Sequence, residues 1–116
     1  MLMAAVLALC AWDASAEDTL KKVADTGRIT LAYRESSVPF SYDAGVGKPL
    51  GFSMDIANAV VAEVKRVVNK PVLEVGYIPV TSANRIPLLV NGTIDLECGS
   101  TTNNTARGRD VQFAIN

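Results

Sequence analysis

The chain has 116 residues, of which 49% are hydrophobic and 20% are charged, and its net charge is −1 at pH 7. This length and composition suffice for one small domain, but the balanced charge argues against binding to nucleic acid or to an anionic membrane surface. The sequence contains no histidine, the commonest general base and metal ligand, which argues against an enzyme and against a metal site.

Residues 1–16 predict a secretory signal peptide. An apolar run of about ten residues, too short to span a membrane, ends in Ala14-Ser15-Ala16, a small-residue cleavage pattern. We expect the mature protein to begin near Glu17. Three alternatives stay open: a start further upstream, since no Lys or Arg precedes the run; a hydrophobic N-terminal helix; and a lipid anchor on Cys10.

The first elements of the mature chain are predicted to be a short helix and a strand. Apolar residues recur at helical spacing from Asp18 onward, and Gly27 is a plausible helix stop. Residues 29–33 follow as a strand. Several Pro and Gly residues then make 35–51 a loop or an irregular hairpin.

The longest helix is predicted over residues 54–68, where apolar side chains share one face. Ser53 is a candidate cap at its start, and Pro71 ends it. The β-rich segment 72–80 then predicts a second strand.

The remaining chain continues the alternation of helices and strands. A helix is predicted from about Ala83 to Val90 with Asn91-Gly92 as its stop, followed by a strand over 93–98, a short helix, and a strand that begins at 111–115. This order predicts an α/β fold with a mostly parallel sheet covered on both faces.

Hydroxyls and an arginine stand at two predicted helix starts, in residues 81–85 and 100–107. A helix start presents unpaired N–H groups and the positive end of the helix dipole, so it attracts anions and disfavours a nearby Arg. A negative ligand is therefore expected there. Together with Arg34, three guanidinium groups follow three predicted strands, whose carboxyl ends should meet at one sheet edge. The pattern predicts a pocket for a small molecule with more than one carboxylate. The candidate ligand residues are Arg34, Ser82, Arg85, Ser100, Thr102 and Arg107.

Each candidate also has a purely structural alternative. Arg34 with Glu35 makes a possible local ion pair, Arg85 a possible partner for a surface carboxylate, and Arg107 a possible solvated charge. The hydroxyls of 100–102 include a possible helix cap. Cys98 would be unpaired in the mature chain, and without a histidine to activate it we interpret it as an inert, buried side chain.

Four segments carry a family resemblance: residues 34–42, 51–56, 78–89 and 91–104. In register, they resemble the periplasmic solute-binding proteins of ABC transporters for polar amino acids (family 3), and among these the glutamate/aspartate-binding proteins. The resemblance runs from about residue 18 to the last residue.

The resemblance implies a two-lobed clamshell that captures L-glutamate or L-aspartate in the periplasm and delivers it to a membrane permease. It implies that Arg34, Ser82 and Arg85 hold the side-chain carboxylate with Ser100 alongside. By the same resemblance, Arg107 would pair with the α-carboxylate and Thr102 would lie near the α-ammonium group.

Members of this family are much longer than this chain. We therefore expect residues 17–116 to be the N-terminal part of the first lobe, with the second lobe absent, and to bind weakly or not at all alone. No cofactor is implied, and the full-length protein is expected to be a monomer. The alternatives are a ligand-binding module of a sensor or receptor and, less favoured, a periplasmic enzyme on the same fold. The carboxylate candidates for catalysis, Glu35, Asp55 and Glu97, show no catalytic arrangement.

Overall fold

The computed structural model describes residues 16–114, with side chains from residue 19 onward. The signal peptide predicted over residues 1–16 therefore lies, apart from Ala16, outside the described residues. The first described element is α1 (Ala16–Thr26), which ends at Gly27 as predicted, with the N–H of Gly27 donating to the carbonyl of Val23 at 2.9 Å.

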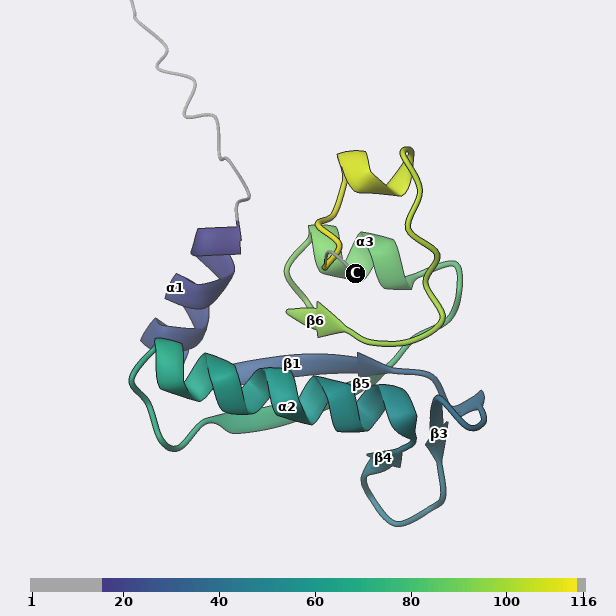
Figure 1. Ribbon diagram of the computed structural model, residues 1–116, viewed down its shortest axis with the longest axis horizontal. Coiled ribbons are helices and arrows are strands. Elements are labelled where there is room, and N and C mark those ends of the chain that lie inside the picture. The colour runs from purple at the N-terminus through teal and green to yellow at the C-terminus, as the bar shows by residue number, and fades with distance from the viewer. Residues whose placement is uncertain (1–15, 115–116) are drawn as a thin grey trace, which may run out of the picture.

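A parallel sheet of three strands, in the order β5-β1-β6, forms the centre of the fold (Figure 1). The central strand β1 (Arg28–Tyr33) pairs along its whole length with β5 (Glu74–Pro79), from Arg28 opposite Glu74 to Tyr33 opposite Pro79. On its other side β1 pairs with the short strand β6 (Leu96–Glu97). The predicted α/β fold with a parallel sheet is therefore confirmed.

Helices cover both faces of this sheet. On one face, α2 (Phe52–Val67) packs Met54 and Val61 against Ile29 and Leu31 of β1. On the other face, Ala32 of β1 belongs to a second cluster whose members come from β5, the loop before β6 and α3 (Arg85–Val90). Side chains alternate between the two faces of a strand, so neighbouring residues of β1 pack against different helices. The second cluster consists of Ala32, Ile78, Val80, Leu88, Leu89 and Ile94.

The segment predicted as a loop or irregular hairpin forms a small antiparallel sheet between β1 and α2. Its strands are β2 (Ser36–Ser37), β3 (Ser41–Asp43) and β4 (Pro49–Leu50). Within it, the fully buried Ser41 accepts a hydrogen bond from the N–H of Arg34 at 2.8 Å and donates one to the Arg34 carbonyl at 3.0 Å. The small sheet thereby fixes the backbone of Arg34.

The prediction that Ser53 caps the longest helix is wrong. The helix begins one residue earlier, at Phe52, and Gly51 takes the capping position without a side chain. The first N–H groups of α2 are instead satisfied by the turn between β2 and β3, because Phe52 donates to the carbonyl of Pro39 at 3.0 Å and Ser53 to that of Phe40 at 2.8 Å. Backbone carbonyls that are distant in sequence thus replace the expected hydroxyl.

The last part of the chain is less regular than predicted. The strand expected over 93–98 is only two residues long, and residues 111–114 are not a strand. Among residues 16–114, no strand pairs with 111–114, and a strand without a paired neighbour leaves its backbone groups unsatisfied. No helix begins at 100–102 either. The short 3₁₀ helix η1 (Arg107–Arg109) starts later, where the Asn104 side chain accepts a hydrogen bond from the N–H of Arg107 at 2.9 Å.

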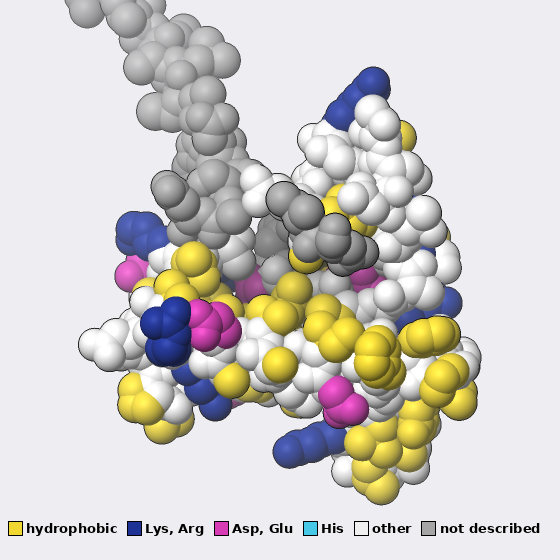
Figure 2. All heavy atoms as spheres, viewed as in Figure 1, with side chains coloured by type: hydrophobic (Ala, Val, Ile, Leu, Met, Phe, Trp, Pro, Cys, Tyr) yellow, Lys and Arg dark blue, Asp and Glu magenta, His cyan; other side chains and the backbone are white. Residues whose placement is uncertain are grey.

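One side of α2 exposes hydrophobic side chains. Phe52, Ile56 and Val60 follow one another at four-residue spacing and are 61%, 45% and 37% exposed. Figure 2 shows hydrophobic side chains gathered along this face and over the small antiparallel sheet. Within the described part of the chain, none of the helices has the length and apolar character that crossing a bilayer requires.

Asp95, the residue before β6, joins α1, β1 and the loop between α3 and β6. Its side chain is 4% exposed and accepts hydrogen bonds from Lys22 of α1 and from the N–H of Thr30 in β1, both at 2.9 Å. Lys22 also donates to the carbonyl of Gly92 at 2.7 Å. This carboxylate therefore holds the loop between α3 and β6 against the sheet.

We expect Asp95→Ala to lower the free energy of unfolding by about 2 kcal/mol. The substitution leaves the part-buried Thr30 N–H without its partner, whereas Lys22 is 44% exposed and can be solvated. Urea unfolding followed by circular dichroism measures the change. Asp25→Ala is the matched control, because Asp25 is 61% exposed in its pair with Lys21 and should change stability by less than about 0.5 kcal/mol. Equal losses in both variants would contradict the assigned role of Asp95.

Candidate functional site

Arginine and hydroxyl side chains follow the carboxyl ends of all three parallel strands. Arg34 follows β1, the segment 81–85 follows β5, and residues 99–102 follow β6. Arg34 and Ser82, 48 residues apart in the chain, meet directly, since Nη1 of Arg34 donates to Oγ of Ser82 at 2.8 Å. The sheet edge thus brings together side chains from different strands, as the predicted topology requires.

The turn before α3 carries Arg85 into the interior. Thr81 and Asn84 close this turn with reciprocal side-chain bonds: the N–H of Thr81 donates to Oδ1 of Asn84 at 2.7 Å, and the N–H of Asn84 donates to Oγ1 of Thr81 at 3.2 Å. Thr81 and Asn84, which are not among the predicted ligand residues, therefore stabilise the turn that precedes α3. Arg85 is the first residue of α3 and is only 4% exposed.

The guanidinium group of Arg85 is buried with few partners. Its Nε and Nη1 atoms make no hydrogen bond within the described residues, and Nη1 lies 4.0 Å from Oε1 of Glu97. Burial lowers the pKa of Arg85, the Glu97 carboxylate raises it, and the positive charges of Arg107 and Arg34 lower it again. The alternative of a pair with a surface carboxylate is wrong, because both side chains are 5% exposed. Arg85 is thus a buried cation with unused hydrogen-bond donors, and it feels the charges of Arg34 and Arg107.

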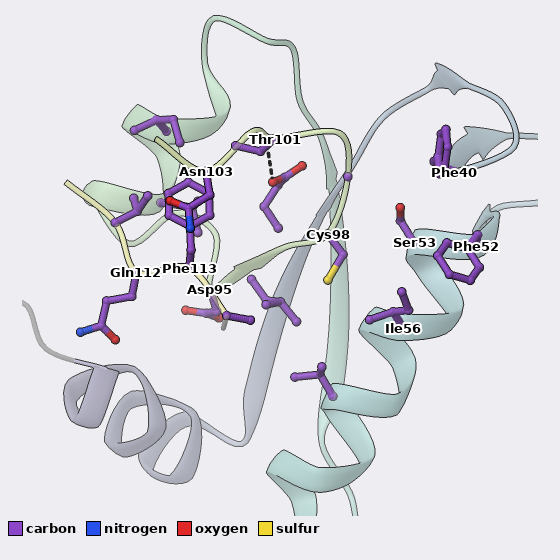
Figure 3. A pocket seen from close by; sticks show the side chains of 18 residues that line it. Phe40, Phe52, Ser53, Ile56, Asp95, Cys98, Thr101, Asn103, Gln112 and Phe113 are labelled. Carbon is purple, nitrogen blue, oxygen red and sulfur yellow. Dashed lines mark hydrogen bonds between the residues drawn. The ribbon is translucent and has the colours of Figure 1, made fainter. Parts of the chain in front are cut away.

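Glu97 is the site residue that sequence reasoning missed. The sequence suggested it only as a catalytic carboxylate, and the structure places it at the end of β6. Its Oε2 accepts a hydrogen bond from Oγ1 of Thr101 at 2.7 Å (Figure 3), and its Oε1 faces Arg85 without a hydrogen bond. The available signal was a carboxylate within the predicted strand 93–98, because a carboxylate is rarely buried without a partner.

Arg107 is half-buried, and it is not simply a solvated charge beside Arg109. Its Nη1 donates to the backbone carbonyl of Thr102 at 2.9 Å, which folds the arginine back over residues 102–107. The residues Ser82, Ser100 and Thr102 are exposed at the same edge. They lie at the surface, whereas Arg85 and Glu97 lie beneath it.

The charges of this cluster are unequal. The positive charges of Arg34 and Arg107 act on Arg85, and one carboxylate, Glu97, opposes them. The arginine cluster, defined as Arg34, Arg85, Arg107 and Glu97, therefore carries two uncompensated positive charges. Guanidinium groups bind carboxylates through paired hydrogen bonds, so the cluster is suited to a ligand with two carboxylates.

A cavity of about 830 Å³ lies between α2 and residues 111–114 (Figure 3). Its walls include Phe40, Phe52, Ile56 and Phe113, and none of the six predicted ligand residues lines it. Glu97 of the arginine cluster and its partner Thr101 also line the cavity, so the cavity borders the cluster. This largely apolar cavity offers no cation to a carboxylate, whereas the arginine cluster does.

Cys98 packs against the core cluster beneath α2. Burial raises the pKa of its thiol, and the negative charge of Glu97 raises it further. The thiol is half-buried, less than predicted, but a protonated thiol is a poor nucleophile, which agrees with the predicted inert role. Residues 16–114 also hold no group of three or more Cys, Asp or Glu side chains placed to bind a metal ion.

Comparison with known proteins places these residues in a family context. The family model of the bacterial extracellular solute-binding proteins, family 3, matches residues 29–116. The Escherichia coli (strain K12) glutamate/aspartate import solute-binding protein is 52% identical over 115 residues, which cover 93% of this chain and 38% of that protein. The L-glutamate/L-aspartate-binding protein of Pseudomonas aeruginosa is 53% identical over 98 residues, covering 84% of this chain and 32% of that protein.

Solved structures agree with the fold. The solute receptor for L-cysteine of Neisseria gonorrhoeae superposes with a TM-score of 0.70 at 25% sequence identity, covering 83% of this chain and 37% of the receptor. The chain thus spans well under half the length of the relatives that it matches. The described residues accordingly show part of the family fold.

Proposed function

The chain belongs to the bacterial extracellular solute-binding proteins of family 3, and from this membership we propose that it binds acidic amino acids for an ABC importer. The ligands are L-glutamate and L-aspartate, and the partner is the membrane permease of that importer. The protein acts in the periplasm after secretion through residues 1–16. Residues 17–116 form the N-terminal part of the first lobe.

The single observation that carries this proposal is the charge of the arginine cluster. Its two uncompensated positive charges suit a ligand with two carboxylates. Relatives that are 52% and 53% identical are named for glutamate and aspartate, and this supports the same ligand class.

Each predicted ligand residue has a role in this proposal. Arg85, with Arg34 and Ser82 joined beside it, holds the side-chain carboxylate, and Ser100 lies alongside. Arg107 pairs with the α-carboxylate, and Thr102 lies near the α-ammonium group. A neutral side chain such as that of glutamine would leave positive charge of the arginine cluster without a carboxylate. This uncompensated charge is the source of selectivity.

Binding by the 116-residue chain is proposed to be weak. Three of the six ligand residues, Ser82, Ser100 and Thr102, are exposed, so water competes for the same donors as the ligand. In this family fold, tight capture requires a second surface that closes over the ligand and excludes water.

An NMR titration of the ¹⁵N-labelled chain with L-glutamate, L-aspartate and L-glutamine tests the proposal. We expect the acidic pair to shift amide signals of residues 81–85 and 99–107, with dissociation constants of about 1 mM or weaker. Glutamine should shift them less at the same concentration. Equal shifts for glutamine, or none for any of the three ligands, would overturn the proposed ligand class. Micromolar affinity would overturn the argument from exposure.

A further inference from the structure

We propose that Glu97 is a specificity-determining residue: a built-in counter-ion that neutralises Arg85 in the empty site. It leaves the arginine cluster with two positive charges for the ligand. The inference rests on the proposed function and assigns a role to a residue outside the six predicted ligand contacts.

The geometry gives Glu97 the position of an internal carboxylate. Its Oε1 lies 4.0 Å from Nη1 of Arg85, which is too long for a hydrogen bond but close enough for a strong charge interaction between two groups that are 5% exposed. Neither of these two atoms has a hydrogen-bond partner within the described residues. Glu97 thus compensates the charge of Arg85 without occupying its donors.

Two neighbours keep the Glu97 carboxylate in place. Thr101 donates a hydrogen bond to Oε2 at 2.7 Å (Figure 3). Gly99 leaves the space that the carboxylate needs, because a Cβ atom at this position would collide with Oε1 of Glu97. The carboxylate is therefore restrained on both sides and directed at the guanidinium group.

The role in specificity follows from the charge balance. Without Glu97, the empty site would hold three positive charges, one of them buried, and any small anion would relieve their repulsion. With Glu97 present, an anion with a single charge relieves less repulsion, while a ligand with two carboxylates still matches the remaining charge. Glu97 thereby favours ligands with two negative groups over anions with a single charge, such as acetate.

Glu97→Gln tests this role, because glutamine keeps the size of the side chain and an oxygen that can accept from Thr101. The full chain is titrated with sulfate, acetate and L-glutamate at ionic strengths near 0.01 M, where screening is weak, and its melting temperature is followed. We expect the variant to melt lower than wild type without anions. We also expect half-maximal stabilisation by sulfate at a concentration lower by about tenfold, since a full negative charge has been removed 4.0 Å from Arg85.

Two further variants make the result specific. Glu74→Gln removes the same charge from an exposed pair with Arg28 and should leave the response to sulfate at the wild-type level. Arg85→Met combined with Glu97→Gln removes both buried charges, so it should melt higher than Glu97→Gln alone and lose the gained response to sulfate. If Glu97→Gln does not fold, the double variant should fold; failure of both would overturn the inference.

The outcomes separate this inference from the proposed function. An unchanged sulfate response in Glu97→Gln, in a wild-type chain that binds L-glutamate, overturns the counter-ion role and leaves the proposed function standing. A gained sulfate response in a chain that shows no preference for L-glutamate supports the counter-ion role and overturns the proposed ligand. Equal gains in Glu97→Gln and Glu74→Gln show a general charge effect and overturn the role of Glu97.

Discussion

Arg85→Met is expected to remove the response of the chain to L-glutamate and L-aspartate. Arg85 is the one buried arginine of the cluster, and it keeps donors without partners. Truncating one partner of a buried, hydrogen-bonded charge pair costs about 2–5 kcal/mol, which corresponds to a loss of affinity of roughly 30-fold to several thousand-fold. Because the starting affinity is proposed to be weak, the amide shifts caused by either ligand should disappear.

The matched control for this substitution is Arg109→Met. Arg109 lies in η1 and is exposed, so the same charge is removed from the same region without disturbing the buried pair. It should keep the ligand shifts within about twofold of wild type. Circular dichroism checks that Arg85→Met is folded. If Arg85→Met does not fold, the double variant with Glu97→Gln takes its place, because it also removes the carboxylate that Arg85→Met leaves unpaired. Ligand shifts that survive in a folded Arg85→Met chain would exclude Arg85 from the site.

The sequence was sufficient to predict the architecture and the convergence of the arginines. Helical spacing, glycine stops and β-rich segments each reflect local preferences, and the parallel arrangement follows from their alternation. Since parallel strands end at one edge, Arg34 and Ser82 were expected to be neighbours, and they are joined by a hydrogen bond. Their role in ligand binding stays a prediction.

The parts that could not be predicted depend on contacts between distant residues. The start of α2 is satisfied by carbonyls of Pro39 and Phe40, so no local pattern identifies Gly51 as its cap. Glu97 is adjacent to Arg85 only because β6 and α3 pack together. The hydroxyls of residues 100–102 have the composition of a helix cap, but the helix that would need them starts later in the chain.

Gly51→Ala is expected to destabilise the fold by roughly 3–5 kcal/mol, a large share of the stability of a small domain. Gly51 has φ 121° and ψ 171°, a backbone conformation that is essentially restricted to glycine. An added Cβ atom would also lie 2.6 Å from the carbonyl carbon of Phe40 and 2.8 Å from the oxygen of Pro39. These are rigid backbone atoms, and their carbonyls accept the first hydrogen bonds of α2, so moving them removes the cap of the helix.

Two other glycines separate the causes of this loss. Gly47 has φ 79°, but a Cβ atom added there would meet no atom within 4 Å, so Gly47→Ala reports the cost of a left-handed backbone alone, about 1 kcal/mol. Gly108 has neither a positive φ nor a near neighbour, so Gly108→Ala should stay within about 0.5 kcal/mol of wild type. Urea unfolding of the three variants gives the comparison. If Gly51→Ala costs no more than Gly47→Ala, the contact between Gly51 and the carbonyls of Pro39 and Phe40 does not hold the start of α2.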